Sequence, residues 1–508
     1  MIVENKKTVY DITLISIIII KNEVKYMLDF RPVGYVVGLL VFGLGLSMLL
    51  PMLWDSYAGN GHWFTFLESA LITCTVGGLT ALASANGVTD RLSIQQTFIL
   101  TTVVWVALPF FGALPFYLGA TDASLVDAFF ESISGFTTTG STVLTNIEQL
   151  PVGLKLWRGL LQWFGGIGVV VMAMVFLPAL RIGGMQLFRT EGFDTFGKIL
   201  PRAGQIAQSI SIIYLTLTGL CFVAYLATGM SAIDAIVHAF TTIATGGFSN
   251  SDMSFMKYGP GAEYVASFFM ILAALPFVRY VQFVSGNTRP FFQDSQIRTF
   301  LVVIFLLSTL MGLWHVVEFK DFNEVILRKV FFSVISIITG TGYVSVDYGS
   351  WGAFAVSFFF FLGLIGGCAG STSCSIKIFR FQLLFASIKT QLQRIQSPHG
   401  VFSPRYEGRV VEEEVLSSVI SFFVLFLVSI GIFSILLGLS GLDFVTSISG
   451  AATAFANVGP GLGDEIGPTG NFSGLNDVSK WLLAAAMLIG RLELLVIYAI
   501  LTVNFWRN

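Results

Sequence analysis

A short stretch rich in glycine and threonine recurs four times along the chain, each time after a short apolar segment and before a long one. Each short segment opens with an acidic residue: Asp127, Asp234, Glu324 and Asp443. Asp127 and Asp234 lie 13 residues before Gly140 and Gly247, so Gly247, and not Gly246, corresponds to Gly140. This recurrence predicts four linings of one pore, each a short helix followed by an extended strand.

Residues of this kind suit the passage of a cation. Backbone carbonyls can replace the ion's water shell without adding fixed charge, and glycine accepts the positive φ angles that turn carbonyls inward. Threonine hydroxyls can hold the strand or face the ion, and the short helices would aim their partly negative C-terminal ends at it. The lining predicted to bind the ion comprises Thr138, Thr139, Gly140, Thr245, Gly246, Gly247, Gly340, Thr341, Gly342, Asn457, Val458 and Gly459.

Two points stay open at this stage. The third stretch holds both Gly340 and Gly342, so its register is not determined. Any one of these stretches taken alone would also fit an ordinary loop between two membrane spans. The fourfold recurrence favours a pore.

The apolar character of the chain indicates a membrane protein with several spans. Its 508 residues are 55% hydrophobic and only 11% charged, against about 25% charged in soluble domains. A span needs roughly 20 apolar residues, and the four short segments fall below that length. Irregular backbone is tolerated at membrane depth only where it lines a cavity or is buried in protein. We therefore expect an all-α fold with ten spans and four half-helices that enter the membrane and return.

The expected organisation is four pore repeats behind two extra N-terminal helices. Each repeat would consist of a span, a half-helix with its Gly/Thr strand, and a second span. Residues 1–32 are expected to form an interfacial or cytoplasmic extension, because their apolar run ends at Lys21 and is too short to cross. The predicted boundaries are 33–93 for the two extra helices, 94–203 for repeat 1, 204–295 for repeat 2, 296–409 for repeat 3 and 410–508 for repeat 4.

Charge placement orients this arrangement. Basic residues gather on the side reached after the second span of each repeat: Arg181, Arg189, Lys198, Arg202, Arg279, Arg289, Arg298, Lys377, Arg380, Lys389, Arg394, Arg405 and Arg409. The positive-inside rule places these loops and both termini in the cytoplasm. The opposite side carries acidic residues: Asp122, Asp127, Glu148, Asp252, Asp321, Asp347, Asp464 and Glu465. These residues would concentrate cations at the mouth of the pore. The alternative is that they are ordinary solvated charges.

A run of small residues interrupts the second span of repeat 3. It comprises Gly366, Gly367, Cys368, Ala369, Gly370, Ser371 and Thr372. Each glycine in a helix interior destabilises the helix by about 1 kcal/mol. Three glycines within five positions therefore predict a break, with a flexible gating loop beneath the Gly/Thr strands of the pore. Close helix packing by small residues is the alternative.

Arg491 lies within the last predicted span. A charge at the membrane centre costs at least roughly 2.5–3.5 kcal/mol, so Arg491 should face water or a carboxylate. Facing the pore, it would raise a barrier to cations; paired with another repeat, it would be structural. Glu493 points elsewhere on the helix and is not the expected partner.

On these residues the sequence resembles the superfamily of Trk, Ktr and HKT potassium transporters, and in particular its TrkH/TrkG type. The motifs that carry the resemblance are Thr137–Gly140, Thr245–Ser249, Asn457–Gly461, Gly366–Thr372 and Gly490–Glu493. The resemblance implies a homodimer in the bacterial inner membrane, a cytoplasmic nucleotide-binding regulatory ring of the TrkA type, and gating by the loop at Gly366–Thr372 and by Arg491. Gly140, where sodium-permeable relatives carry serine, favours potassium. The family commonly has a glycine pair where this chain has Cys374 and Ser375.

The expected function is potassium uptake through a selective, gated pore. The alternative is a sodium- or proton-coupled potassium symporter, since coupled carriers also use broken helices. Potassium is the transported ion, and neither an organic cofactor nor a nucleic-acid partner is expected; membrane lipid surrounds the chain. An enzyme is not expected, because no His/Asp/Glu or Cys/His cluster provides a catalytic site.

Overall fold

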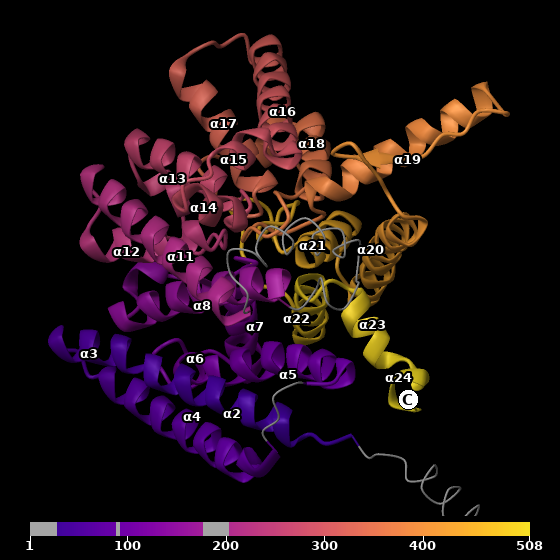
Figure 1. Cartoon of the computed structure of the whole chain (residues 1–508). Coiled ribbons are helices and arrows are strands. Elements are labelled where there is room, and N and C mark those ends of the chain that lie inside the picture. Colours follow the sequence, from indigo (N-terminus) through magenta and orange to yellow (C-terminus); the bar gives the residue numbers. More distant parts are fainter. Residues whose placement is uncertain (1–27, 88–91, 176–202, 508) are drawn as a thin grey trace, which may run out of the picture.

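The computed structural model describes residues 28–87, 92–175 and 203–507, and these ranges are almost wholly helical (Figure 1). Seven of the described helices are long and apolar enough to cross a membrane, and two bent pairs of helices reach that length together. The all-α, multi-pass membrane fold is thus confirmed. The predicted extension at residues 1–27 and the basic residues Arg181, Arg189, Lys198 and Arg202 lie outside the described ranges.

The elements follow one another around the molecule in chain order (Figure 1). The α-helices are α2 (Arg31–Ser47), α3 (Leu49–Tyr57), α4 (Trp63–Ser84), α5 (Ile94–Gly112), α6 (Leu114–Tyr117), α7 (Leu125–Phe136), α8 (Val152–Val175), α11 (Ala203–Ala227), α12 (Ala232–Ile243), α13 (Pro260–Ala273), α14 (Phe277–Val284), α15 (Arg289–Gln293), α16 (Ser295–Phe319), α17 (Glu324–Ile338), α18 (Ala353–Gly363), α19 (Ile378–Gln396), α20 (Glu413–Leu439), α21 (Phe444–Ala456), α22 (Asp477–Arg491), α23 (Leu495–Leu501) and α24 (Val503–Arg507). Short 3-10 turns are η1 (Ala85–Gly87), η2 (Ile147–Gln149), η3 (Ser254–Lys257) and η4 (Tyr348–Trp351), and strands β1 (Arg405–Tyr406) and β2 (Arg409–Val410) form a small antiparallel hairpin.

The N-terminal helices α2 and α4 pack closely through glycine. A Cβ atom added to Gly38 would come within 2.5 Å of an α4 backbone nitrogen, and one added to Gly77 within 2.5 Å of the Phe42 nitrogen. Small residues allow membrane helices this approach. Near the end of α3, the buried Asp55 carboxylate accepts a 2.8 Å hydrogen bond from the Gly153 amide. This bond connects the N-terminal helices to α8.

The four short helices α7, α12, α17 and α21 are each capped at the N-terminus by a side chain. Ser124 and Ser231 accept hydrogen bonds from the amides of Asp127 and Asp234, which explains why repeats 1 and 2 share the same spacing. In α21 it is Asp443 itself that caps the helix. The four acidic residues therefore all lie at the N-terminus of a short helix, but only Asp443 is itself the capping residue.

Two predicted spans are broken, not continuous. The second span expected in repeat 2 divides at Pro276 into α13 and α14, which meet at 88°. Proline lacks the amide that would continue the helix and disfavours helical backbone before it. The last predicted span, the second of repeat 4, divides into α22 and α23 at 109°, where Glu493 takes a positive φ of 59°.

Candidate ion pathway

Each Gly/Thr stretch begins at the C-terminal end of a short helix and has the same backbone pattern. Two residues with positive φ are separated by one residue without it, and the second is always glycine: Gly140 (88°), Gly247 (80°), Gly342 (79°) and Gly459 (108°). The first is Thr138 (53°), Thr245 (50°), Gly340 (75°) or Asn457 (52°). This pattern aligns Gly342 with Gly140, which settles the register of the third stretch.

The four glycines form a closed ring of contacts. A Cβ atom added to each would collide with a backbone carbonyl oxygen of the next stretch in order: Gly140 with Gly246 (2.2 Å), Gly247 with Thr341 (1.9 Å), Gly342 with Val458 (2.0 Å) and Gly459 with Thr139 (2.7 Å). In every case the carbonyl belongs to the residue just before the next glycine. The structure thus brings all four predicted stretches together around one axis, at one level.

Side chains of the short helices hold the stretches from behind. Ser134 donates a 2.6 Å hydrogen bond to the Ser141 carbonyl, and Ser336 makes the matching 2.8 Å bond to the Tyr343 carbonyl. The Asn457 amide donates to the Thr139 hydroxyl at 2.9 Å and so joins the fourth stretch to the first. Buried hydroxyl and amide groups paired in this way resist displacement.

Gln162 of α8 is buried behind the second stretch and bonds it at two points. Its Nε2 donates to the Gly246 carbonyl at 2.6 Å, and its Oε1 accepts from the Phe248 amide at 3.1 Å. The side chain therefore spans Gly247 and fixes the direction of the carbonyl that faces Gly140.

A buried ion pair joins the first and second stretches. Glu131 of α7 accepts a 2.8 Å hydrogen bond from Arg158 Nε of α8 and a 3.0 Å bond from the Val143 amide. Arg158 Nη1 donates to the Ser249 carbonyl at 2.7 Å, and its guanidinium lies 4.1 Å from the Phe248 ring centroid. Both charged side chains are almost fully buried, so each depends on the other for compensation.

A second carboxylate braces the third stretch. Glu263 of α13 accepts from Arg328 Nε at 2.7 Å and from Lys329 Nζ at 2.5 Å, both on α17. Lys329 Nζ also donates to the Ser345 carbonyl at 2.7 Å, three residues beyond Gly342. A further ion pair, of 2.6 Å, joins Lys480 Nζ of α22 to Asp127 of α7.

A cavity of about 130 Å³ lies on one side of the glycine ring and is lined by all four stretches. Of the eight acidic residues expected at the mouth, Asp252 lines this cavity. Glu148 lies behind it and accepts a 2.5 Å bond from the Ser251 hydroxyl. Hydrogen bonding from Asp252 and Ser251 lowers the pKa of Glu148 to about 2, while burial and the nearby Glu148 carboxylate raise the pKa of Asp252 to about 6.

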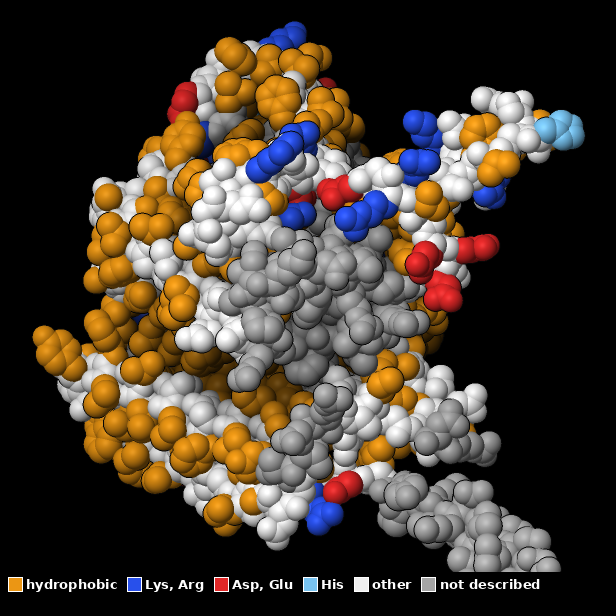
Figure 2. Space-filling view, viewed as in Figure 1, with side chains coloured by type: hydrophobic (Ala, Val, Ile, Leu, Met, Phe, Trp, Pro, Cys, Tyr) orange, Lys and Arg blue, Asp and Glu red, His pale blue; other side chains and the backbone are white. Residues whose placement is uncertain are grey.

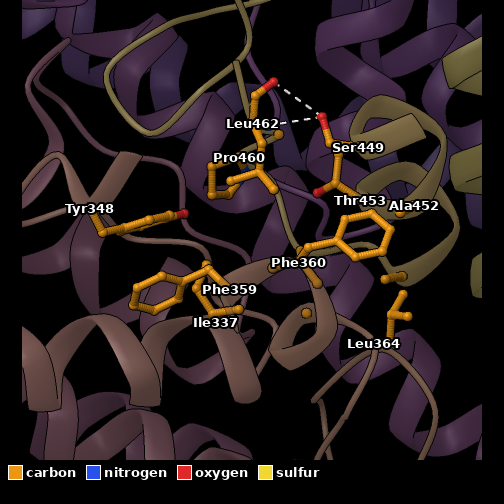
Figure 3. Close-up of a pocket in the computed structure, with 14 residues that line it drawn as sticks. Ile337, Tyr348, Phe359, Phe360, Leu364, Ser449, Ala452, Thr453, Pro460 and Leu462 are labelled. Atoms are coloured by element: carbon orange, nitrogen blue, oxygen red, sulfur yellow. Dashed lines mark hydrogen bonds between the residues drawn. The ribbon is translucent and has the colours of Figure 1, made fainter. Parts of the chain in front are cut away.

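A small apolar cavity of about 30 Å³ lies behind the fourth stretch, among residues of α17, α18 and α21 (Figure 3). Such a volume has room for about one water molecule. Above it, Ser449 accepts from the Leu462 amide at 3.0 Å and donates to the Leu462 carbonyl at 3.1 Å, the two dashed bonds in Figure 3. This pair of bonds holds the backbone that follows Gly459.

The predicted break in repeat 3 is present: α18 ends at Gly363 and α19 begins at Ile378. The intervening loop is bonded to the corner between α13 and α14, where the Cys368 amide donates to the Ala274 carbonyl at 3.0 Å and the Thr372 hydroxyl to the Ala273 carbonyl at 3.0 Å. The small residues also allow close packing within the loop, since a Cβ atom on Gly366 would lie 1.9 Å from the Cys374 carbonyl oxygen. The loop is thus buried and held by neighbouring repeats.

Arg491, at the end of α22, faces this loop. Its Nη1 donates to the Cys374 sulfur at 2.5 Å, and its Nε and Nη2 have no hydrogen-bond partner within the described ranges. Glu493 instead pairs with Arg380, whose guanidinium stacks 3.7 Å from the Phe422 ring centroid. Arg380 is therefore a buried ion-pair residue and not a solvated charge, while its place on the cytoplasmic side stays a prediction.

Several residues of this pathway were not singled out from the sequence: Glu131, Arg158, Gln162, Glu263 and Lys480. The signal that marked Arg491, a charge inside an apolar segment, also applies to Glu131 and Arg158. Their pairing was not predictable, because they lie 27 residues apart on different helices. Within the described part of the chain, no three His, Cys, Asp or Glu residues gather as a metal site would require.

Comparison with known proteins finds relatives that cover most of the chain. Residues 62–504 match the family model TrkH, described as cation transport protein. The chain is 43% identical to the Trk system potassium uptake protein TrkI of Halomonas elongata over 480 residues, covering 94% of this chain and 97% of that protein. It is 32% identical to TrkH of Escherichia coli, covering 95% and 100%. The crystal structure of the potassium transporter TrkH from Vibrio parahaemolyticus superposes with a TM-score of 0.86 at 31% identity, covering 94% of this chain and 100% of that one.

Proposed function

This chain belongs to the TrkH family of cation transport proteins, and from that premise we propose that it takes up potassium through a selective, gated pore. Its relatives are named potassium uptake proteins of the Trk system. The chain is a multi-pass membrane protein, and we place it in the bacterial inner membrane because the named relatives are bacterial.

The observation that carries the proposal is the ring of four glycines, each against a carbonyl of the next stretch. The filter is assigned to the twelve residues predicted from the sequence, from Thr138 to Gly459. Carbonyl oxygens arranged around one axis can replace the hydration shell of a potassium ion. Glycine is needed at the ring because its φ is positive and a side chain would strike a carbonyl.

We assign the gate to the loop Gly366–Thr372 and to Arg491. The loop adjoins the filter, since a Cβ on Gly340 would lie 3.0 Å from Cys374 Cβ at its returning end. Arg491 reaches the same point with a guanidinium that lacks a carboxylate partner within the described ranges. A positive charge at the end of a cation filter raises the energy of a passing cation.

The assembly is proposed on the strength of family membership. It comprises a homodimer in membrane lipid and a cytoplasmic regulatory ring of the TrkA type. The side proposed as cytoplasmic carries α19, which extends from the body and bears exposed basic and apolar residues (Figures 1 and 2). A partner that binds there would act on the gating loop directly, because α19 begins where that loop ends.

The second candidate is a sodium- or proton-coupled symporter. The bent pairs α13–α14 and α22–α23 favour it, since coupled carriers place broken helices at their binding sites. The two functions differ in their need for a second gradient.

Rubidium uptake into liposomes containing the purified protein separates them. With no sodium or proton gradient imposed, we expect uptake that potassium blocks and sodium does not. Uptake that requires either gradient would establish the symporter instead. The control is protein-free liposomes; the regulatory ring is added to both sets where basal uptake is low.

A further inference from the structure

The thiol of Cys374 lies where the gating loop meets the filter. Its sulfur is 3.6 Å from the Thr138 hydroxyl of the first stretch, and its Cβ would lie 3.0 Å from a Cβ on Gly340 of the third. The next residue, Ser375, donates its amide to the carbonyl of Ala456 at the end of α21. Three of the four repeats therefore meet around this one side chain.

A second observation concerns what faces the thiol. Arg491 is only 5% exposed, its Nη1 lies 2.5 Å from the Cys374 sulfur, and its remaining two donor groups are unpartnered within the described ranges. A buried guanidinium needs an electron-rich partner, and here the sulfur supplies one. The thiolate, and not the thiol, is the nucleophilic form of cysteine.

We propose that Cys374 is a site of covalent thiol modification by small cationic disulfide-forming reagents that enter along the ion pathway. The inference rests on the proposed function, which makes this position part of that pathway. With an aminoethyl methanethiosulfonate, the Cys374 thiolate attacks the reagent's thiol sulfur. A new S–S bond joins Cys374 to the aminoethylthio group, the reagent's own S–S bond breaks, methanesulfinate leaves with the electron pair, and the thiol proton passes to water.

The expected consequence is loss of conduction. The adduct places an ammonium beside the guanidinium of Arg491, so two positive charges would then border the filter. Rubidium uptake should fall roughly tenfold or more, the size expected of a like charge within a few ångströms in a medium less polar than water. A reducing agent such as dithiothreitol should restore it, because it removes the adduct.

The test uses the full chain in liposomes, with each protein compared with its own rate before treatment. The wild-type chain and Cys74→Ser should lose uptake and regain it on reduction, because Cys74 lies on α4, away from the pathway. Cys374→Ser should be unaffected by the reagent. Peptide mapping by mass spectrometry should find the adduct on Cys374, and potassium should slow its formation relative to a large impermeant cation.

Absence of an adduct on Cys374 in the wild-type chain would overturn the proposal, as would an adduct that leaves uptake unchanged. Equal inhibition of Cys374→Ser would also overturn it. If the untreated protein takes up no rubidium even with the regulatory ring added, the proposed function has failed and not this site. In that case the proposal for Cys374 is decided by the peptide mapping. An adduct on Cys374 whose formation is slowed by potassium would support the site, and the absence of either the adduct or the slowing would overturn it.

Discussion

At the scale of single residues, the proposed filter is held by buried charges behind it and not by the Gly/Thr residues alone. Glu131 bonds the first stretch and Arg158 bonds the second, so their ion pair joins two repeats. Removing one partner of such a pair leaves a buried charge without compensation, which costs about 3–5 kcal/mol. Each partner of the pair is therefore needed as long as the other is present.

Glu131→Gln should lower the thermal unfolding midpoint of the detergent-solubilised protein, because Arg158 loses its countercharge. The change should correspond to about 3–5 kcal/mol. The double variant Glu131→Gln, Arg158→Met should recover part of the loss, since no charge then stays unpaired. Scanning fluorimetry measures this, with the exposed Arg31→Gln as the matched control. A midpoint for Glu131→Gln equal to that of Arg31→Gln would contradict the assignment.

Asp252 gives the cavity beside the glycine ring a charge that depends on pH. Its raised pKa of about 6 means that it is charged above that pH and neutral below it. Because a carboxylate at the mouth attracts cations, the initial rate of rubidium uptake should fall as external pH drops through 6. Asp252→Asn should take up rubidium slowly at every pH and lose this step. An unchanged pH profile in Asp252→Asn would show that the residue plays no such part.

At the scale of elements, the sequence predicts local features better than it predicts contacts. The four short helices and the break after Gly363 follow from acidic starts, apolar length and clustered glycines, all of which are local. The corner at Pro276 also follows from a local signal, the proline itself. The bend at Glu493 does not, because it depends on a positive φ in a residue other than glycine. Gln162 could not be identified, because its role depends on where α8 packs against another repeat.

The packing of α2 on α4 makes two adjacent glycines unequal. A Cβ on Gly77 would lie 2.5 Å from the Phe42 backbone nitrogen, while one on Gly78 would make an ordinary 3.6 Å contact. Gly77→Val should therefore force the helices apart and lower the unfolding midpoint by the equivalent of about 1–3 kcal/mol, the usual cost of overpacking. Gly78→Val is the control and should unfold like the wild type. Equal midpoints for both variants would argue against close packing at Gly77.

In the proposed gate the loop and α22 meet at Arg491, and the charge of Arg491 is the feature that would oppose cations. Arg491→Ala should raise basal rubidium leak several-fold in the absence of a regulatory partner, because the barrier loses one positive charge. Arg491→Lys keeps the charge and should leak like the wild type. Basal uptake into liposomes measures both. Flux through Arg491→Ala that stays level or falls would make the residue structural.

At the scale of the whole molecule, the fourfold recurrence in the sequence becomes a closed ring in space. Each repeat places its glycine against the following repeat, and Gly459 returns to Thr139. Asn457 and Lys480 of the last repeat bond Thr139 and Asp127 of the first, so the ring closes through side chains as well. The sequence predicts that four equivalent stretches line one pore; their order and level around it follow only from the packed structure.

The central claim is that this ring is the potassium filter, and rubidium uptake by Gly247→Ala tests it most directly. The added methyl would lie 1.9 Å from the Thr341 carbonyl oxygen, whereas Gly219 of α11 has open space around it and provides the control Gly219→Ala. Uptake and its competition by potassium and sodium are measured at equal protein in the liposomes. Selective uptake should be lost in Gly247→Ala and kept in Gly219→Ala. Uptake by Gly247→Ala with the rate and potassium preference of the wild type would contradict the account.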